Sequence, residues 1–69
     1  MDTNRVGRIV RDVVVQGGFS CTVVTVHEDP RSWRVTIRDE GERLVTFDVP
    51  KGTPVQLREA IVDALDWVE

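Results

Sequence analysis

The 69-residue sequence has one cysteine and one histidine, and each scarcity removes a class of protein. Cys21 cannot form a disulfide within the chain, which excludes a disulfide-stabilised scaffold. A zinc site built on Cys21 and His27 would need carboxylates or a second chain to complete its ligands. Gly17-Gly18 lacks the spacing of a phosphate-binding loop and precedes a predicted strand instead of a helix. We therefore expect no metal and no cofactor.

Long apolar runs are also missing. No stretch approaches the ~20 apolar residues of a membrane-spanning helix, and residues 1–4 carry no run of signal-peptide length. We therefore expect a cytoplasmic protein without a membrane partner. The formal net charge of −3 disfavours nucleic-acid binding, because phosphate groups require concentrated positive charge. The short length predicts a single domain over residues 1–69 with a thin core.

Apolar residues at helical spacing predict a first helix that begins near Asp2, Thr3 or Asn4 and ends at Gly17-Gly18. Its apolar stripe consists of Val6, Ile9, Val10, Val13 and Val14. The opposite side carries three arginines, Arg5, Arg8 and Arg11. These arginines are interpreted either as a solvated face that pairs with acids elsewhere or as a surface that contacts phosphates.

Three short alternating segments follow, which predict strands over residues 19–26, 32–38 and 43–49. In the first strand, Val24 and Val26 fall on the face opposite Val23, unless a bulge between Val23 and Val24 restores the register. Residues 27–30 predict one turn. Residues 39–42 predict a hairpin turn in which Gly41 is available for a positive φ.

A second helix is predicted after Thr53, which acts as its N-cap with Pro54 in the first turn and Gln56 completing a capping box. Its buried stripe consists of Leu57, Ile61, Ala64, Leu65 and Val68, with Trp67 at the edge and Val62 pointing away. Acidic residues cluster in its last turns, namely Asp63, Asp66 and Glu69. We interpret them as a solubilising face or as partners of arginines from the first helix or from a second copy.

The predicted fold is α+β, with the order α-β-β-β-α and a three-stranded antiparallel meander that both helices cover on one face. The residues expected in the core, with Trp33 largely buried beside them, are Val6, Ile9, Val10, Val13, Phe19, Cys21, Val35, Ile37, Val45, Phe47, Leu57, Ile61, Leu65 and Val68. The other face of the sheet is then open. It lacks the exposed aromatic residues on which single-stranded bases stack.

The element order resembles the double-stranded-RNA-binding domain, in which the first helix, the turn between the first two strands and a lysine-rich start of the last helix contact RNA. In this chain a single lysine, Lys51, stands at that start. The order also resembles HicA-type toxins, which are mRNA interferases of the same fold with a catalytic histidine. The matching residues are Gly18-Phe19 after the first helix, His27 near the first turn, and Pro50-Lys51-Gly52-Thr53 before the last helix.

Three functions are compatible with these patterns. The leading interpretation is a small non-enzymatic interaction or oligomerisation module that binds a second copy of itself, as a homodimer, or another protein. Its open face or edge strand would carry the contact, through Val24, Val26, Arg34, Thr36, Arg38 and Leu44. The alternative is an RNA-binding domain or HicA-like interferase that uses Arg5, Arg8, Arg11 and Lys51, with His27 as the catalytic candidate. A small-molecule enzyme has least support, because the chain leaves little room for a pocket of ~300 Å³.

Overall fold

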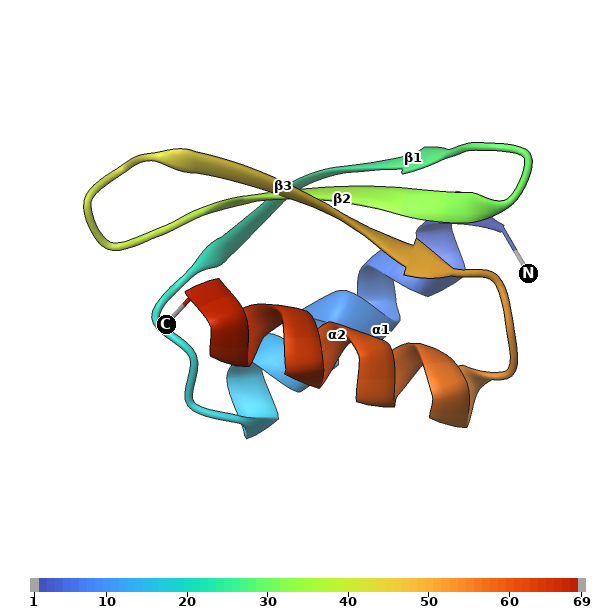
Figure 1. The fold of residues 1–69 in the computed structure, drawn as a ribbon. Coiled ribbons are helices and arrows are strands. Elements are labelled where there is room, and N and C mark those ends of the chain that lie inside the picture. The colour runs from blue at the N-terminus through green and yellow to red at the C-terminus, as the bar shows by residue number, and fades with distance from the viewer. Residues whose placement is uncertain (1, 69) are drawn as a thin grey trace.

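The computed structural model describes residues 2–68, with the side chain of Val68 lying outside the described part. The elements follow in the predicted order α-β-β-β-α (Figure 1). Their bounds are α1 Thr3–Gln16, β1 Thr22–Glu28, β2 Ser32–Arg38, β3 Leu44–Pro50 and α2 Pro54–Val68. The first strand begins three residues later than predicted, and it includes His27, which was expected in the turn.

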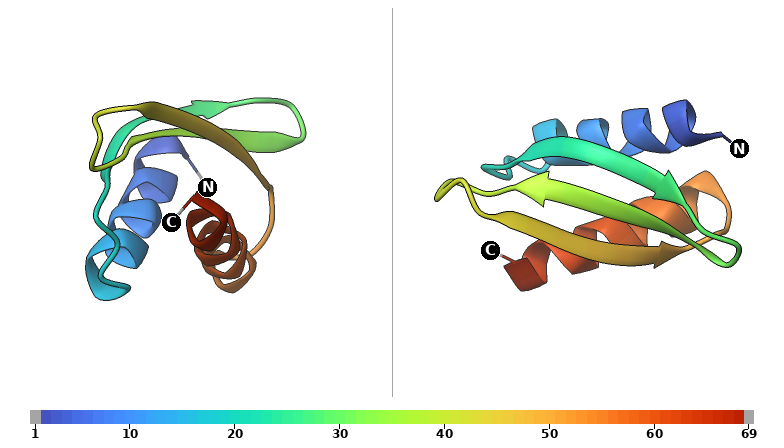
Figure 2. Two further views of the ribbon diagram at one scale, coloured as in Figure 1. Left: turned by 60° about the vertical axis from the view of Figure 1, so that its left-hand side comes forward. Right: turned by 90° about the horizontal axis from the view of Figure 1, so that it is seen from above.

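The three strands form an antiparallel sheet in the order β1-β2-β3, so β2 is central and both other strands are edges. Both helices lie on the same face of this sheet, as predicted (Figure 2). Helix α1 packs against β1, α2 packs against β3, and the two helices contact each other. The arrangement confirms the predicted α+β meander and leaves the other face of the sheet uncovered.

Both ends of α1 are formed by local hydrogen bonds. The side chain of Asp2 caps the first turn by accepting from the backbone N–H of Arg5 at 2.9 Å. At the other end, Phe19 N–H donates to Val14 C=O, and Gly18 N–H donates to Val15 C=O. Gly18 has φ +70°. This is a Schellman motif, in which glycine avoids the strain of the left-handed conformation.

The start of α2 is the predicted capping box. Gln56 N–H donates to Thr53 Oγ1 at 3.2 Å, and Thr53 N–H donates to Gln56 Oε1 at 3.0 Å. The helix is joined to α1 by an ion pair between Arg58 and Asp12, at 3.5 Å. This pair shows which side of α2 faces α1, and so places the opposite side of the helix at the β3 edge.

A bulge in β1 decides which valines face the helices. Val23 pairs with Ile37, but the next registered pairs are Thr25 with Thr36 and Val26 with Val35, so Val24 is the extra residue. The bulge returns Val26 to the covered face, where it packs against the core. The bulge that the sequence analysis offered as an alternative therefore occurs, and the alternative in which Val26 lies on the open face is wrong. Val24 lies in the bulge at 42% exposure.

The core lies between the sheet and the two helices. Its buried members are Val6, Ile9, Val10, Val13, Val14, Trp33, Val35, Ile37, Val49, Leu57, Ile61 and Leu65. Four residues predicted to be buried are half-buried and pack against its margin, namely Phe19, Cys21, Val45 and Phe47. They lie before β1 or on the edge strand β3, where two helices cannot fully cover a three-stranded sheet. The prediction for Val68 concerns a side chain outside the described part.

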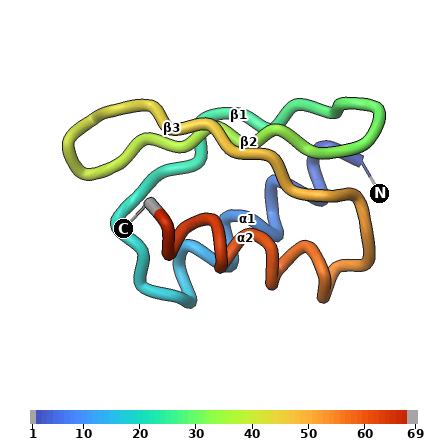
Figure 3. Tube along the Cα trace, viewed as in Figure 1, coloured from blue at the N-terminus to red at the C-terminus, as the bar shows by residue number. Residues whose placement is uncertain are grey.

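The β2–β3 turn projects beyond the end of α2 (Figure 3). Glu42 N–H donates to Asp39 C=O at 3.0 Å, and Asp39 N–H donates to Arg43 C=O at 3.0 Å. Glu42 has φ +63°, so it takes the left-handed position that was expected for Gly41. A three-residue hairpin loop consists of a type I turn followed by one residue in the left-handed conformation. In this loop the left-handed position falls on Glu42, one residue after the glycine.

Candidate interaction surfaces

The open face of the sheet is a set of polar cross-strand rows. One row joins Thr25, Thr36 and Thr46, in which the hydroxyls of Thr36 and Thr46 are 3.1 Å apart. The next row joins His27, Arg34 and Asp48. Polar cross-strand pairs of this kind stabilise a sheet from its solvent side.

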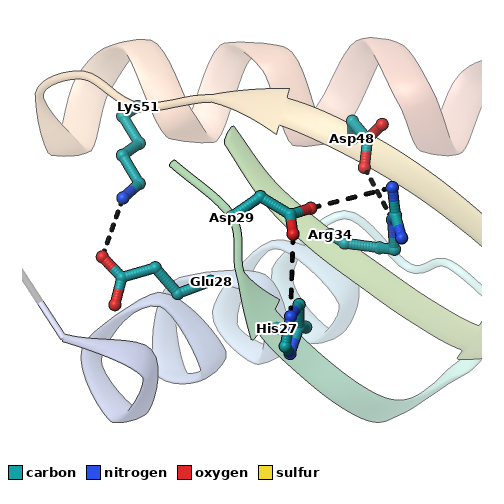
Figure 4. A network of polar contacts seen from close by, with 6 residues as sticks. All are labelled: His27, Glu28, Asp29, Arg34, Asp48 and Lys51. Carbon is teal, nitrogen blue, oxygen red and sulfur yellow. Dashed lines mark hydrogen bonds and ion pairs between the residues drawn. The ribbon is translucent and has the colours of Figure 1, made fainter. Parts of the chain in front are cut away.

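An ion network centres on Arg34 in this polar face (Figure 4). Its Nε lies 3.3 Å from Asp48 Oδ1, and its Nη2 lies 3.7 Å from Asp29 Oδ2. Asp29 Oδ1 in turn lies 3.6 Å from His27 Nε2. His27 therefore lies on β1 beside a carboxylate, with its side chain 70% exposed.

Four of the six predicted interaction residues lie on the open face: Arg34, Thr36, Arg38 and Leu44. Val26 does not, because the bulge turns it to the covered face, and Val24 is the bulge residue, which lines a groove beside α1. Leu44, at 62% exposure, is an apolar residue among polar neighbours there. The face is more polar than the strict alternation of the sequence predicted.

Lys51 is engaged within the chain. Its Nζ lies 2.7 Å from Glu28 Oε2 (Figure 4) and 5.0 Å from the centroid of the Trp33 ring. The lysine thus covers one side of a buried tryptophan while Glu28 offsets its charge. The connection between β3 and α2, which contains Lys51, lies at the same end of the molecule as the start of α1 and the β1–β2 turn (Figures 1 and 2). These are the segments that the RNA-binding resemblance implies.

The arginines of α1 remain without an ion pair within residues 2–68. Like Arg31 and Arg38, the three arginines have no carboxylate within salt-bridge distance in that range, whereas Arg43, Lys51 and Arg58 each pair with one carboxylate and Arg34 pairs with two. The expected pairing with Asp63 and Asp66 does not occur, and Glu69 lies outside the described residues. Lys51, the fourth basic residue of the RNA-binding alternative, is paired with Glu28 and so adds little positive charge to these arginines.

The two sheet edges differ in regularity. Strand β1 is interrupted by its bulge, and bulges protect an edge by twisting it away from further pairing. Strand β3 pairs with β2 without interruption from Leu44 to Pro50. Because Asp39 and Arg43 form a hydrogen-bonded pair, alternation directs the backbone N–H and C=O groups of Leu44, Thr46 and Asp48 away from β2.

Apolar side chains accompany the β3 edge. Val45 and Phe47 are half-buried on its covered face, and Ala60 packs beside the core from α2. Trp67 follows Ala60 by seven residues, which places it on the same side of α2, and it is 91% exposed. Val45 and Phe47 were predicted to be core residues, and Trp67 was predicted at the edge of the buried stripe of the helix. Their partial exposure could have been inferred from the position of β3 at an edge.

Two depressions flank α1. A groove of about 330 Å³ lies between α1 and the bulged part of β1, and a wider one is lined by Asp2, Asn4, Arg5 and Arg8 from one helix end alone. The groove beside β1 is slightly larger than the ~300 Å³ for which we expected little room. Both depressions are open to solvent. Within residues 2–68, no three side chains of histidine, cysteine, aspartate or glutamate gather closely enough to hold a metal ion.

Comparison with family models gives no match, and neither the curated proteins nor the solved structures contain a match to this chain. The structure has the topology of one helix, a three-stranded antiparallel meander and a second helix, and no match supports the resemblance to the RNA-binding domain or to HicA-type toxins. Within residues 2–68, neither helix has the length and apolarity required to cross a membrane.

Proposed function

We propose that this chain is a non-enzymatic interaction module that forms a homodimer through its edge strand β3. The observation that carries this proposal is the uninterrupted edge of β3, whose outward backbone groups are accompanied by half-buried Val45 and Phe47. An exposed, regular edge strand is a ready site for pairing with another strand. The β1 edge is less suited, because its bulge breaks the ladder.

The outward backbone N–H and C=O groups of β3 suit an antiparallel pairing of two copies about a two-fold axis. If Thr46 of each copy meets at the axis, Leu44 of one copy pairs with Asp48 of the other, and all three outward N–H groups find carbonyl acceptors. Val45 then lies opposite Phe47 of the second copy on the covered face. An aromatic side chain opposite a β-branched one is a favourable cross-strand pair. Pro50, which has no N–H, remains outside the paired segment.

The helix next to this edge suits the same contact. Ala60 and Ala64 present small side chains on the side of α2 away from α1, and Trp67 adds a large exposed aromatic surface beyond them. Tryptophan is enriched where protein partners meet. A domain of this size has a thin core, so burial of Val45, Phe47 and Trp67 against a second copy would add to its stability.

Amide hydrogen exchange tests the proposed edge directly. The amides of Leu44, Thr46 and Asp48 face solvent in one copy and should exchange rapidly at low protein concentration. At high concentration, the same three amides should become protected, while those of Val45 and Phe47, bonded to β2, are protected throughout. Exchange of the three outward amides that stays rapid at every concentration would rule out pairing through β3.

RNA binding is the second candidate, and it is supported by the unpaired arginines of α1 at the same end as Lys51. It has less support, because Glu28 engages the lysine and the net charge is −3. Binding of duplex RNA at physiological salt that is lost on Arg8→Gln would favour this candidate. RNA cleavage lost on His27→Ala would favour the interferase form of it.

A further inference from the structure

The groove between α1 and β1 combines a positive wall with an aliphatic one. Its helix wall consists of Thr3, Asn4, Gly7, Arg8 and Arg11. Its strand wall runs from Val23 to Val26 and includes the exposed bulge residue Val24. The groove is lined by α1 and β1, and β1 is the edge of the sheet opposite β3 (Figure 2), so the groove is separate from the proposed dimer contact.

The positive wall lacks a counter-charge inside the described chain. Arg8 and Arg11 have no ion pair within residues 2–68, although the sequence holds 12 acidic residues against 9 basic ones. The unpaired state of these two guanidinium groups thus does not come from a shortage of carboxylates. Guanidinium groups form their strongest side-chain contacts with carboxylates or phosphates, through paired N–H donors.

Gly7 is a second, independent feature of the same groove. It lies inside α1, where glycine is less favourable than alanine, yet a Cβ built at this position would meet nothing within 4 Å. Packing within the chain therefore gives no reason for a glycine here. The missing side chain leaves the helix backbone open to the groove, which allows a bound chain to approach it closely.

We propose that this groove binds an extended, acidic segment of a partner protein. The carboxylates of that segment pair with Arg8 and Arg11, its backbone passes over Gly7, and its aliphatic side chains lie on Val24. A protein segment fits better than nucleic acid, because three of the nine lining residues are valines and the described lining offers no aromatic ring for base stacking.

The probe for this site is a synthetic octapeptide of alternating glutamate and valine, added to the full chain labelled with ¹⁵N for NMR. We expect saturable shifts of the amides of Gly7, Arg8, Arg11 and Val24, and no such shifts with the matched peptide of alternating lysine and valine. Absence of saturable shifts in the groove would overturn the proposal. So would an oligouridylate or a short RNA duplex that binds there more tightly than the acidic peptide.

Two substitutions separate groove binding from general effects on the fold. Gly7→Ala should raise the midpoint of thermal unfolding yet weaken peptide binding about fivefold, because the new methyl group fills the groove without touching the rest of the chain. Arg8→Gln should weaken binding to a similar extent. Arg5→Gln removes the same charge from the same helix outside this groove and should change affinity less than twofold. Equal losses for Arg5→Gln and Arg8→Gln, or unchanged binding for Gly7→Ala, would overturn the proposal.

Discussion

Lys51 lies over the indole ring of Trp33, with its Nζ 5.0 Å from the ring centroid and 2.7 Å from a carboxylate oxygen of Glu28. Trp33 is 2% exposed, so the lysine closes the side of the core at the entrance to α2. We expect Lys51→Ala to lower the free energy of unfolding by about 1 kcal/mol, through loss of the cation–π contact. Urea unfolding followed by Trp fluorescence measures the change. Lys51→Arg keeps the cation and should retain most of the stability; equal losses for both variants would contradict this role.

The left-handed conformation of Glu42 predicts a stabilising substitution. Glu42→Gly should raise the free energy of unfolding by about 1 kcal/mol, because glycine tolerates φ +63° without the contact between Cβ and backbone that strains other residues. For a domain of this length the increase corresponds to a rise of about 4–8 °C in the unfolding midpoint. Glu40→Gly, in the same turn, removes the same charge from a residue without a positive φ and should not stabilise the protein. Equal effects of the two variants would show that charge is the cause.

The hydrogen-bonded carboxylate of Asp39 should make the folded protein less stable in acid. The backbone N–H of Arg43 donates to its carboxylate at 2.9 Å and, together with the Arg43 guanidinium, holds the pKa of Asp39 below its ordinary value. A lowered pKa in the folded state means that the unfolded state binds the proton more readily, so this contribution is present at neutral pH. It should be lost between about pH 4 and the lowered pKa of the folded protein.

Substitutions around this hairpin check the pH dependence. Asp39→Asn should flatten the acid limb of a plot of unfolding free energy against pH. Arg43→Gln keeps the backbone N–H, the largest cause of the lowered pKa, and should leave most of the dependence in place. An acid limb that is unchanged by Asp39→Asn would show that the carboxylate contributes nothing to it.

The bulge in β1 predicts opposite tolerances for two neighbouring valines. Val26 packs against the core, so Val26→Glu should lower the free energy of unfolding by about 2 kcal/mol. Val24→Glu introduces the same side chain at the exposed bulge residue and should cost about 0.5 kcal/mol or less. Chemical denaturation compares the two variants. A larger loss for Val24→Glu would mean that β1 has no bulge and follows strict alternation.

Much of the fold follows from local patterns that the sequence states directly. The cap at Asp2, the Schellman end at Gly18 and the box between Thr53 and Gln56 each depend on residues within a few positions of one another. The box was predicted as it is, the cap was predicted among three candidates, and the helix end was predicted at the Gly17-Gly18 pair. The clean alternation of Ser32–Arg38 likewise predicted the faces of the central strand, including buried Trp33.

The remaining features depend on tertiary context. Alternation left two registers open for β1, with and without a bulge after Val23, and only the pairing with β2 decides between them. Phe47 alternates like a core residue, and its partial exposure follows from the position of β3 at an edge. The partner of Lys51 lies 23 positions away in Glu28, a separation that no local pattern reports. The groove at Gly7 is formed by α1 and β1 together, so neither segment alone predicts it.

Sedimentation equilibrium of the wild type beside Thr46→Pro and Thr46→Val tests self-association through β3 most directly. Thr46→Pro removes an outward N–H that makes no bond to β2, as edge positions permit, and Thr46→Val keeps that N–H. We expect the wild type and Thr46→Val to approach twice the monomer mass as concentration rises, and Thr46→Pro to remain at the monomer mass while folded. A wild type that stays monomeric at high micromolar concentration, or a folded Thr46→Pro that associates as strongly as the wild type, would contradict the proposed dimer.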